Sequence, residues 1–273
     1  MKTAFAHVAA EYDAYRPSYP PEVIDHLQTL LAGPCEQGHG ATCAQRDRGR
    51  PIVVDVGAGT GIFARQMAAR RWRVVAVEPS AAMLRVGIVH RLAADAPPES
   101  ARLHAVAATA ECLPMASESV DLVTAAQAFH WFNPPIALAE FARVLRPGGA
   151  MALLWNNRDR SRHPIVDRFE ELIRRYNPAH DREYRDQDWP AKIAQSGRFH
   201  PTTHHRIEWE WCITPDQFVG FSRTISYVRN VIRRDRLTRF EDDLRNLALA
   251  AFPCGVCRVP MWTGLWTARR LHR

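Results

Sequence analysis

The glycine-rich stretch DVGAGTG, Asp55–Gly61, constrains the fold of this chain more than any other feature. It follows the β-branched run PIVV and precedes a helical pattern over about Ile62–Arg71. Gly57 and Gly59 allow a tight turn in which the backbone approaches a ligand closely, and the following helix offers free N–H groups. A glycine-rich turn between a strand and a helix therefore predicts a ligand site in an α/β protein.

The same rhythm of strand, loop and helix continues to about Asn156. Further apolar runs are RVVAVEPS, ARLHAVAATAE, SVDLVTAAQ and AMALLWN, and helical patterns begin near Ala81 and cover PPIALAEFARVL. Continuous apolar strands that alternate with helices are typical of parallel sheets with both faces covered. We expect an α/β fold: a doubly wound, mostly parallel Rossmann-like sheet with helices on both faces, and a C-terminal cap over the ligand.

The pattern divides the domain into four predicted segments. Residues 1–34 form an N-terminal helical lid, and residues 35–51, polar and glycine-bearing, form a surface insertion. Residues 52–157 form the ligand-binding core. Residues 158–273 supply cap helices and the closing strands of the same domain.

The last segment carries its own local signals. A helical pattern covers about Ile165–Tyr176, and HHRIEWEWCI alternates as a strand does. TPDQFVGFSRTISYV predicts a helix with Thr214 as N-cap and Pro215 at the first helical position. The end of the chain, CRVPMWTGLWTARR, indicates a last pair of strands.

The formal net charge of +7 and a pI near 9.4 favour acidic partners, nucleic acid among them. The basic residues are nearly all Arg and mostly dispersed. The densest groups, Arg233–Arg236 and the C-terminal tail, are interpreted as solvated faces. No apolar run reaches the length of a membrane span, and charges interrupt the start too early for a secretory signal. We expect a cytoplasmic protein with no membrane partner.

The six cysteines do not predict a disulfide framework in such a chain. Cys254 and Cys257 form the one CxxC motif, and Cys35, His39 and Cys43 are the other closely spaced candidates for a zinc site. A lone CxxC is weak evidence for zinc or redox chemistry. We therefore expect no metal.

Two acidic residues near the glycine loop bear on which ligand the loop binds. The loop has the spacing Gly-x-Gly-x-Gly, and dinucleotide-binding folds use a similar loop for pyrophosphate. Asp55 would repel pyrophosphate but suits the ammonium group of an amino-acid ligand. Glu78 ends the second strand, where a carboxylate can accept hydrogen bonds from both ribose hydroxyls. NAD-binding folds share the second feature, so Glu78 alone does not discriminate.

Taken together, several stretches resemble the class I S-adenosylmethionine-dependent methyltransferases, specifically the small-molecule type 11 group. These stretches are VVDVGAGTG, VVAVEPSAAML, ATAECLP, SVDLVTAAQAFHWF and EFARVLRPGGAMALLW, in family order and spacing. They cover about Ile52 to Asn156, and the resemblance is looser beyond residue 160. The N-terminal AAEYDAYRPSYP is similar to the entry segment of bacterial proteins related to trans-aconitate methyltransferase.

The resemblance implies S-adenosylmethionine as the cofactor. It implies that Asp55 and the backbone of residues 57–59 hold the methionine end, and that Glu78 binds the ribose. Met83 would pack near the adenine. The adenine edge would be framed by Thr109, Ala110 and Glu111, and many relatives have Asp at the position of Thr109. The loop residues implied in binding are Gly57, Ala58 and Gly59.

Further cofactor contacts are implied at the fourth strand and at the N-terminus. Gln127 would lie beside the methionine moiety, although it could instead simply bond the backbone. Tyr12, Tyr15 and Arg16 would close over the cofactor, with Arg16 as a partner for its carboxylate. Packing of the lid against the core is the alternative role for both tyrosines.

Methyl transfer from a sulfonium is an in-line displacement, so the protein mainly has to hold the nucleophile and the methyl group together. A general base is needed only where the nucleophile must lose a proton. His130 follows the fourth strand and is the candidate base. Alternatively, the aromatic cluster Phe129–Phe132 lines the pocket and His130 is one of its walls.

The acceptor site is expected next to the fourth and fifth strands and in the cap. Arg223 could bind a substrate carboxylate with two hydrogen bonds, or form an ordinary ion pair. The predicted substrate-binding residues are His130, Trp131, Trp155, Asn157, Arg158, Arg223 and Tyr227.

Three functions fit these observations. The leading hypothesis is methyl transfer to a small-molecule acceptor, on a carboxylate or a hydroxyl. A nucleic-acid amino-methyltransferase is the second, from the charge and the motif Asn133–Pro135. Eight residues separate that motif from Thr124, however, and Ile136 stands where an aromatic residue would stack, so the motif is interpreted as a helix start. The third is a catalytically silent cofactor-binding scaffold. The sequence leaves the acceptor and the oligomeric state undetermined.

Overall fold

The computed structural model describes residues 9–32, 50–89, 102–180 and 187–271, and the statements below concern these residues. Seven strands form one sheet in the order β3-β2-β1-β4-β5-β7-β6. The first five strands run parallel, and β7 is antiparallel to both β5 and β6. The strands are β1 (Ile52–Val56), β2 (Arg73–Val77), β3 (Leu103–Val106), β4 (Val120–Ala126), β5 (Leu145–Arg158), β6 (Thr203–Ile213) and β7 (Cys257–Arg269).

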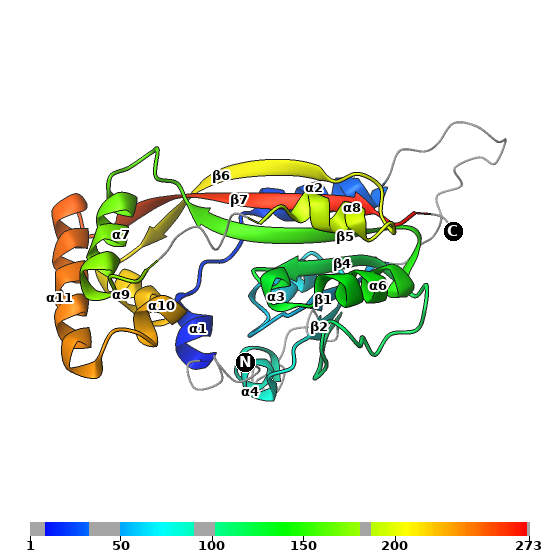
Figure 1. The fold of residues 1–273 in the computed structure, drawn as a ribbon, viewed down its shortest axis with the longest axis horizontal. Helices are drawn as coiled ribbons and strands as arrows, with labels where there is room; N and C mark the ends of the chain where they lie inside the picture. Colours follow the sequence, from blue (N-terminus) through cyan, green and yellow to red (C-terminus); the bar gives the residue numbers. More distant parts are fainter. Residues whose placement is uncertain (1–8, 33–49, 90–101, 181–186, 272–273) are drawn as a thin grey trace.

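Helices lie on both faces of this sheet, which confirms the predicted α/β, doubly wound, Rossmann-like fold (Figure 1). The N-terminal and core helices are α1 (Ala9–Tyr15), α2 (Pro21–Ala32), α3 (Ile62–Ala69), α4 (Ala81–Leu84), the π-helical turn η2 (Arg85–Val89), the 3-10 turn η4 (Phe129–Trp131) and α6 (Pro134–Val144). The C-terminal helices are α7 (Ile165–Tyr176), α8 (Trp189–Gln195), α9 (Pro215–Arg223), α10 (Ser226–Arg229) and α11 (Arg234–Ala251).

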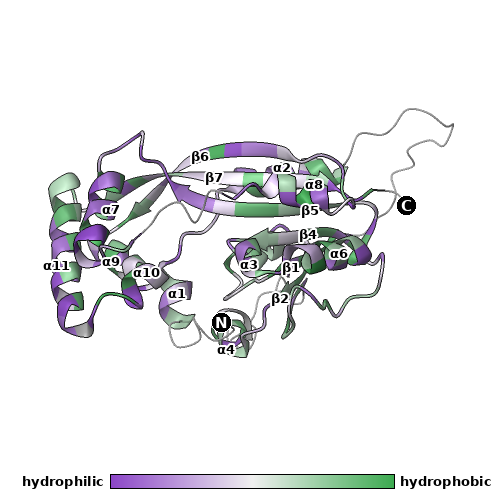
Figure 2. Ribbon diagram, viewed as in Figure 1, coloured by the Kyte–Doolittle hydropathy of each residue, from purple (hydrophilic) through white to green (hydrophobic). Residues whose placement is uncertain are grey.

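The central strands are apolar because both of their faces are covered, as Figure 2 shows by their hydropathy. One face packs on α2 and α3 through side chains such as Leu27 and Phe63. The other face packs on α6 and α8 through side chains such as Phe141 and Trp189. Burial of this apolar surface on two sides holds the carboxyl ends of β1 and β4 in fixed positions.

Strands β5, β6 and β7 extend beyond the core and carry a helical cap of α7, α9, α10 and α11 (Figure 1). The cap has its own apolar core, in which Phe169, Phe218 and Phe240 pack beside Val259 and Met261. Helix α1 lies between the cap and the parallel part of the sheet (Figure 1). The fold therefore brings N-terminal, core and C-terminal residues to one place.

The structure departs from the sequence patterns at several elements. Residues Cys257–Arg269 form a single strand, so the prediction of a final strand pair is wrong. Helices α8 and α11 had no predicted counterpart. Asn133 stands at the N-cap of α6, as predicted, but its side chain makes no capping bond. Instead the Asn133 backbone N–H donates to Glu111 Oε1 over 3.0 Å. Among the described helices, none combines the length and apolar character needed to cross a membrane.

Candidate functional site

The glycine loop lies between β1 and α3, at the point where the strand order reverses between β1 and β4. Gly57 has φ +68°, and a Cβ there would lie 2.6 Å from the Ala128 side chain, so only glycine fits. The backbone N–H groups of Gly57 and Ala58 donate to Val77 O over 2.8 and 3.1 Å. These bonds fasten the loop to the end of β2.

Asp55 is buried at the end of β1, opposite Thr124 of β4 in the strand register. The Thr124 hydroxyl donates to Asp55 Oδ1 over 2.7 Å, and Oδ2 has no hydrogen-bond partner among the described residues. Burial raises the pKa of Asp55 to about 7, against the opposing effect of the Thr124 hydroxyl. A buried carboxylate with one orphaned oxygen is suited to a cationic ligand group.

Glu78 follows β2, and its carboxylate is already oriented by the backbone. Oε2 accepts from Gly59 N over 3.1 Å, and Oε1 accepts from Ser80 N over 2.9 Å. Burial raises the pKa of Glu78, and the two N–H bonds oppose that rise. Each carboxylate oxygen keeps lone pairs for a further donor, such as a ribose hydroxyl.

A cavity of about 260 Å³, the switch-point cavity, opens at these residues. It is lined by Tyr12, Arg16, Pro17, Tyr19, Asp55, Gly57, Ala58, Gly59, Ile62, Phe63, Glu78, Pro79, Ser80, Met83, Thr109, Ala110, Glu111, Ala126, Gln127, Ala128, Trp131, Phe132 and Asn156. Every residue predicted for the cofactor lies here except Tyr15. The sequence interpretation missed Tyr19 and Asn156, which come from the segment between α1 and α2 and from β5.

Arg16 is the one cation that lines this cavity among the described residues. Its Nη2 donates to Thr224 O over 2.8 Å, and its guanidinium lies over the Tyr12 and Phe221 rings at 4.8 and 5.5 Å. Its Nε is buried without a hydrogen-bond partner among the described residues. Arg16 is thus held in place by rings and a carbonyl rather than by an acid, which leaves its charge for a ligand.

A second cavity, of about 980 Å³, lies beside the first between the core and the cap. This aromatic cavity is lined by Tyr12, Arg16, Gln127, Phe129, His130, Trp131, Phe132, Pro134, Trp155, Asn157, Arg158, Asn177, Ala179, His180, Gln187, Trp189, Lys192, Phe221, Ile225, Ser226, Tyr227, Val231, Trp262 and Trp266. The residues that line both cavities mark where the contents of the two would meet: Tyr12, Arg16, Gln127, Trp131 and Phe132.

Gln127 stands at this meeting point with φ +57°, an unusual backbone conformation for a residue with a side chain. Its backbone N–H donates to Leu154 O over 2.8 Å, and its side-chain Nε2 donates to Asn156 O over 3.0 Å. Two bonds to β5 therefore hold a strained residue at the end of β4. Such strain is characteristic of functional sites.

His130 lines the aromatic cavity in the turn η4. The indole Nε1–H of Trp155 donates to His130 Nδ1 over a long 3.5 Å, and the His130 and Trp131 rings lie 4.9 Å apart. An imidazole that accepts at Nδ1 carries its proton on Nε2 when it is neutral. In this tautomer Nε2 is a donor rather than an acceptor, which favours the wall over the base as the role of His130.

Arg158 belongs to a buried polar cluster at the cap end of the aromatic cavity. Its Nη2 donates to Glu170 Oε1 over 2.5 Å and to the Tyr227 hydroxyl over 3.3 Å. Glu170 Oε2 also lies 2.9 Å from His180 Nε2, and the His180 ring stacks on Tyr227 at 4.2 Å. The Glu170 side chain does not line the cavity, whereas Arg158, His180 and Tyr227 do.

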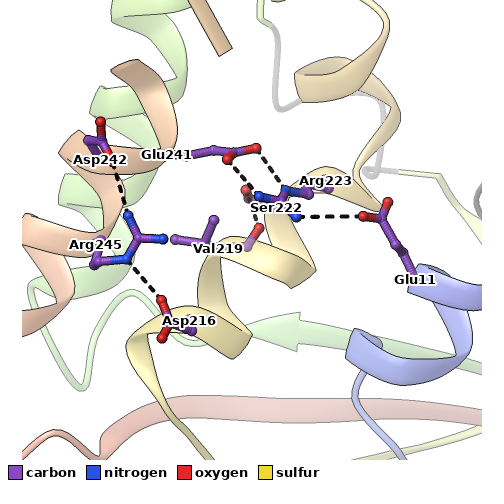
Figure 3. Close-up of polar contacts among 8 residues, drawn as sticks. All are labelled: Glu11, Asp216, Val219, Ser222, Arg223, Glu241, Asp242 and Arg245. Carbon is purple, nitrogen blue, oxygen red and sulfur yellow. Dashed lines mark hydrogen bonds and ion pairs between the residues drawn. The ribbon is translucent and has the colours of Figure 1, made fainter. Parts of the chain in front are cut away.

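Two predicted site residues have other partners. The Tyr15 ring packs against Gly220 of α9, where an added Cβ would lie 2.6 Å from it, and Tyr15 lines neither cavity. Arg223 donates through Nε and Nη2 to both oxygens of Glu241, over 2.8 and 2.7 Å, and lies 3.6 Å from Glu11 (Figure 3). Arg223 thus forms the ion pair that the sequence left open as its alternative role, and it lines neither cavity.

Sequence interpretation missed several residues of the aromatic cavity. They come from α8, from the residues after α7 and from the middle of β7, which lie far apart in the chain and carry no shared motif: Asn177, His180, Trp189, Lys192, Trp262 and Trp266. Tryptophans in such stretches were the available signal, because so large a side chain is often placed at a binding surface.

The described residues contain no group of three metal-ligating side chains. Cys257 is buried and Cys254 exposed, and both are free cysteines. The other candidates for a zinc site, Cys35, His39 and Cys43, lie outside the described residues, as does most of the predicted insertion 35–51.

Comparisons with known proteins agree with this geometry. The pattern of the methyltransferase domain family matches residues 54–153. An uncharacterized methyltransferase of Mycobacterium tuberculosis is 34% identical over 227 residues, 83% of this chain and 78% of the relative. A malonyl-[acyl-carrier protein] O-methyltransferase of Methylococcus capsulatus is 37% identical over 122 residues, 43% of this chain and 42% of the relative. A provisionally assigned type II methyltransferase of Anaeromyxobacter dehalogenans is a similar solved structure, with TM-score 0.60, 25% identity, and coverage of 94% of this chain and 97% of that one.

A doubly wound sheet with a ligand cavity at its switch point defines a Rossmann-like binding protein. The relatives specify the class: the chain belongs to the class I S-adenosylmethionine-dependent methyltransferases, in the group that the matched methyltransferase domain defines. Membership in this family implies S-adenosylmethionine as the methyl donor.

Proposed function

We propose that this methyltransferase transfers the methyl group to a carboxylate or hydroxyl oxygen of a small-molecule acceptor held in the aromatic cavity. The observation that carries the proposal is the meeting of two cavities at Gln127, one with acidic groups and one with aromatic walls. This arrangement supplies separate places for a methyl donor and an acceptor.

The charges that line the switch-point cavity fit S-adenosylmethionine. They comprise the three acids Asp55, Glu78 and Glu111 and the one cation Arg16. The cofactor carries an ammonium, a sulfonium and one carboxylate, so the two sets are complementary. We assign the ammonium to the orphaned oxygen of Asp55, the carboxylate to Arg16 and the ribose hydroxyls to Glu78.

The remaining predicted cofactor residues supply shape rather than charge. Met83 is buried, and its methyl group would lie 3.5 Å from a Cβ on Gly59, so it narrows the cavity beside the loop. Thr109 and Ala110 also line the cavity, and we assign the adenine to this side. When bound, S-adenosylmethionine supplies a methyl group that is already activated on sulfur.

The residues of the chain then have to orient the acceptor and exclude water. Tyr12, Arg16, Trp131 and Phe132 line both cavities together with Gln127, so these side chains border the meeting point. Orientation alone can supply a large part of the rate for such a displacement. The relative from Methylococcus capsulatus is named an O-methyltransferase, which supports oxygen as the accepting atom.

Calorimetry with S-adenosylmethionine tests the cofactor assignment. We expect Glu78→Ala to lower the affinity at least about tenfold, because it removes two charge-assisted hydrogen bonds to the ribose. Glu210→Ala is the control, since Glu210 is exposed on β6 and pairs with Arg258. Absence of binding to the folded wild-type protein, or equal affinity in Glu78→Ala, would contradict the assignment.

The acceptor class requires a separate experiment with a labelled methyl donor. The panel contains small carboxylic acids, small alcohols and phenols, and DNA and RNA of mixed sequence. We expect label in the small molecules. Recovery of methylated bases, with salt-sensitive binding, would support the nucleic-acid hypothesis instead. The cytoplasmic location stays a prediction.

A further inference from the structure

The aromatic cavity has an unbalanced set of charges. Among the described residues that line it, the cations are Arg16, Arg158 and Lys192, and there is no Asp or Glu. Because Arg16 also lines the switch-point cavity and fits the cofactor carboxylate, Arg158 is the buried cation that remains for an acceptor. The cavity therefore fits an acceptor that carries a negative charge.

Arg158 is positioned as an anchor for such an anion. Its side chain is only 6% exposed, and its Nε has no hydrogen-bond partner among the described residues. The guanidinium is held over the Phe169 ring at 5.1 Å and donates through Nη2 to Glu170 and Tyr227. A buried donor without a partner costs free energy, and a ligand oxygen would remove that cost.

A structural ion pair is the alternative role of Arg158, because Glu170 already balances its charge. Glu170 is shared, however: its other oxygen lies 2.9 Å from His180 Nε2. Glu170 thus divides its two oxygens between Arg158 and His180, and both of these side chains line the cavity while Glu170 does not. An anion bound between Arg158 and Tyr227 would accept from the buried Arg158 Nε, which has no partner among the described residues.

The walls of the cavity indicate the shape of the acceptor. The Trp155 and Trp189 rings stack in parallel, with centroids 4.8 Å apart and an interplanar angle of 5°. Trp266 packs its edge against Trp155 at 5.4 Å, and Trp262 also lines the cavity. Flat aromatic walls make most contact with a flat ligand, so the body of the acceptor is a planar ring system.

The anchor is separated from the place of methyl transfer. Gln127 marks the meeting of the cavities and bonds to Asn156 O on β5. Arg158 is two residues further along β5 and lines only the aromatic cavity. At roughly 3.3 Å per strand residue, this places the anchor about 7 Å beyond Asn156. The anchored anion is therefore not the group that receives the methyl.

We infer that the acceptor is a planar, multi-ring aromatic acid whose carboxylate binds Arg158 and Tyr227 and whose hydroxyl is methylated at Gln127. This inference rests on the proposed function and narrows its acceptor group to the hydroxyl. The hydroxyl oxygen forms the new bond to the methyl carbon as the carbon–sulfur bond breaks. The bonding pair stays on sulfur, which leaves S-adenosylhomocysteine, and the hydroxyl proton passes to water.

The test uses calorimetry on the full-length protein saturated with S-adenosylhomocysteine. The probe is a hydroxynaphthoic acid with hydroxyl and carboxyl on opposite rings, and its control is the neutral alcohol in which CH2OH replaces the carboxyl. We expect the acid to bind the wild-type protein at least about tenfold more tightly than the alcohol, since a charge-assisted bond is lost with the carboxylate.

Three variants assign that preference to its residues. Arg158→Gln should abolish it, and Tyr227→Phe, which keeps the ring, should reduce it about threefold or more. Arg160→Gln should leave it unchanged, because Arg160 is exposed and pairs with Asp167. If Arg158→Gln does not fold, the inference is still tested by the relative affinities of acid and alcohol for the wild-type protein and for Tyr227→Phe.

Mass spectrometry of the turnover product with S-adenosylmethionine completes the test, and we expect a methyl ether with a free carboxyl. Equal affinities of acid and alcohol for the wild-type protein, no binding of either, or a methyl ester as product would each overturn the inference. If the wild-type protein does not bind S-adenosylhomocysteine, the proposed function itself is overturned. Failure of the inference and failure of the proposed function are therefore distinguishable.

Discussion

The Thr124 hydroxyl donates to one carboxylate oxygen of Asp55 over 2.7 Å, while the other oxygen is buried without a hydrogen-bond partner among the described residues. Strand pairing places the two residues opposite each other on β1 and β4. The carboxyl group of Asp55, with a pKa of about 7, therefore lies where the strand order reverses between β1 and β4. Its charge state links cofactor binding to pH.

The first prediction concerns the stability of the protein without ligand. The pKa of Asp55 is about 7 in the folded state and 3.8 in the unfolded state, so the folded state binds more protons between these values. The contribution of Asp55 to the free energy of unfolding thus falls as pH rises from about 4 to 7. We expect Asp55→Asn to be more stable than the wild type at pH 8, with a smaller difference at pH 5.

Thermal unfolding at both pH values measures this difference, and Glu118→Gln serves as a control at an exposed acid. Asp55→Asn should lower the affinity for the cofactor, because it removes the negative charge that binds the ammonium group. A variant less stable than the wild type at pH 8, or one with full cofactor affinity, would show that Asp55 is not the strained acid of the site.

The second prediction concerns His130. The long bond from the Trp155 indole to Nδ1 leaves the neutral imidazole with its proton on Nε2. We therefore expect His130→Gln and His130→Ala to lower kcat less than about tenfold once an acceptor is known, since loss of a general base costs about a hundredfold or more. Single-turnover kinetics would measure this, and a larger loss with unchanged cofactor affinity would restore the role of base.

The third prediction concerns the backbone of Gln127. Gln127→Gly and Gln127→Ala both remove the side-chain bond to Asn156 O, but only glycine adopts φ +57° without strain. Denaturant unfolding should show the glycine variant to be about 1 kcal/mol more stable than the alanine variant. Both variants should lose turnover because the orienting bond is gone. Equal stabilities would indicate that the backbone relaxes at this position.

The fourth prediction concerns Arg223, which joins α9 to α11 and α1 in the network of Figure 3. Its bonds to Glu241 raise the pKa of the guanidinium. A double-mutant cycle of Arg223→Gln and Glu241→Gln should give a coupling energy of about 0.5 kcal/mol in the free energy of unfolding. The acceptor KM should stay unchanged. A raised acceptor KM with unchanged stability would indicate that Arg223 binds the acceptor. Arg245→Gln, in the same network, is the control.

The core of this fold could be predicted because its signals are local. Asp55 near the end of β1 and the glycines of the following loop lie in one short stretch, and Glu78 follows the next strand, so parallel pairing alone brings them together. The cap lacked such signals. Helix α11 begins with charged residues. Its residue Glu241 binds Arg223, which lies 18 positions earlier in the chain on α9.

The final strand and Tyr15 show the same limit. Pro260 and Gly264 resemble turn residues, yet β7 continues through both because β5 and β6 pair with it on its two sides. Tyr15 belongs to the N-terminal motif that resembles the family, and only the position of Gly220 in the cap shows where its ring packs. Contacts between distant segments decide these features, and a sequence pattern does not contain them.

A crystal structure of the complex with S-adenosylhomocysteine tests the central claim most directly. We expect the ligand in the switch-point cavity, with its ribose hydroxyls within hydrogen-bonding distance of Glu78, its carboxylate at Arg16 and its sulfur facing Gln127 and the aromatic cavity. A ligand bound elsewhere, or bound here with its sulfur turned away from the aromatic cavity, would contradict the claim that the two cavities hold donor and acceptor.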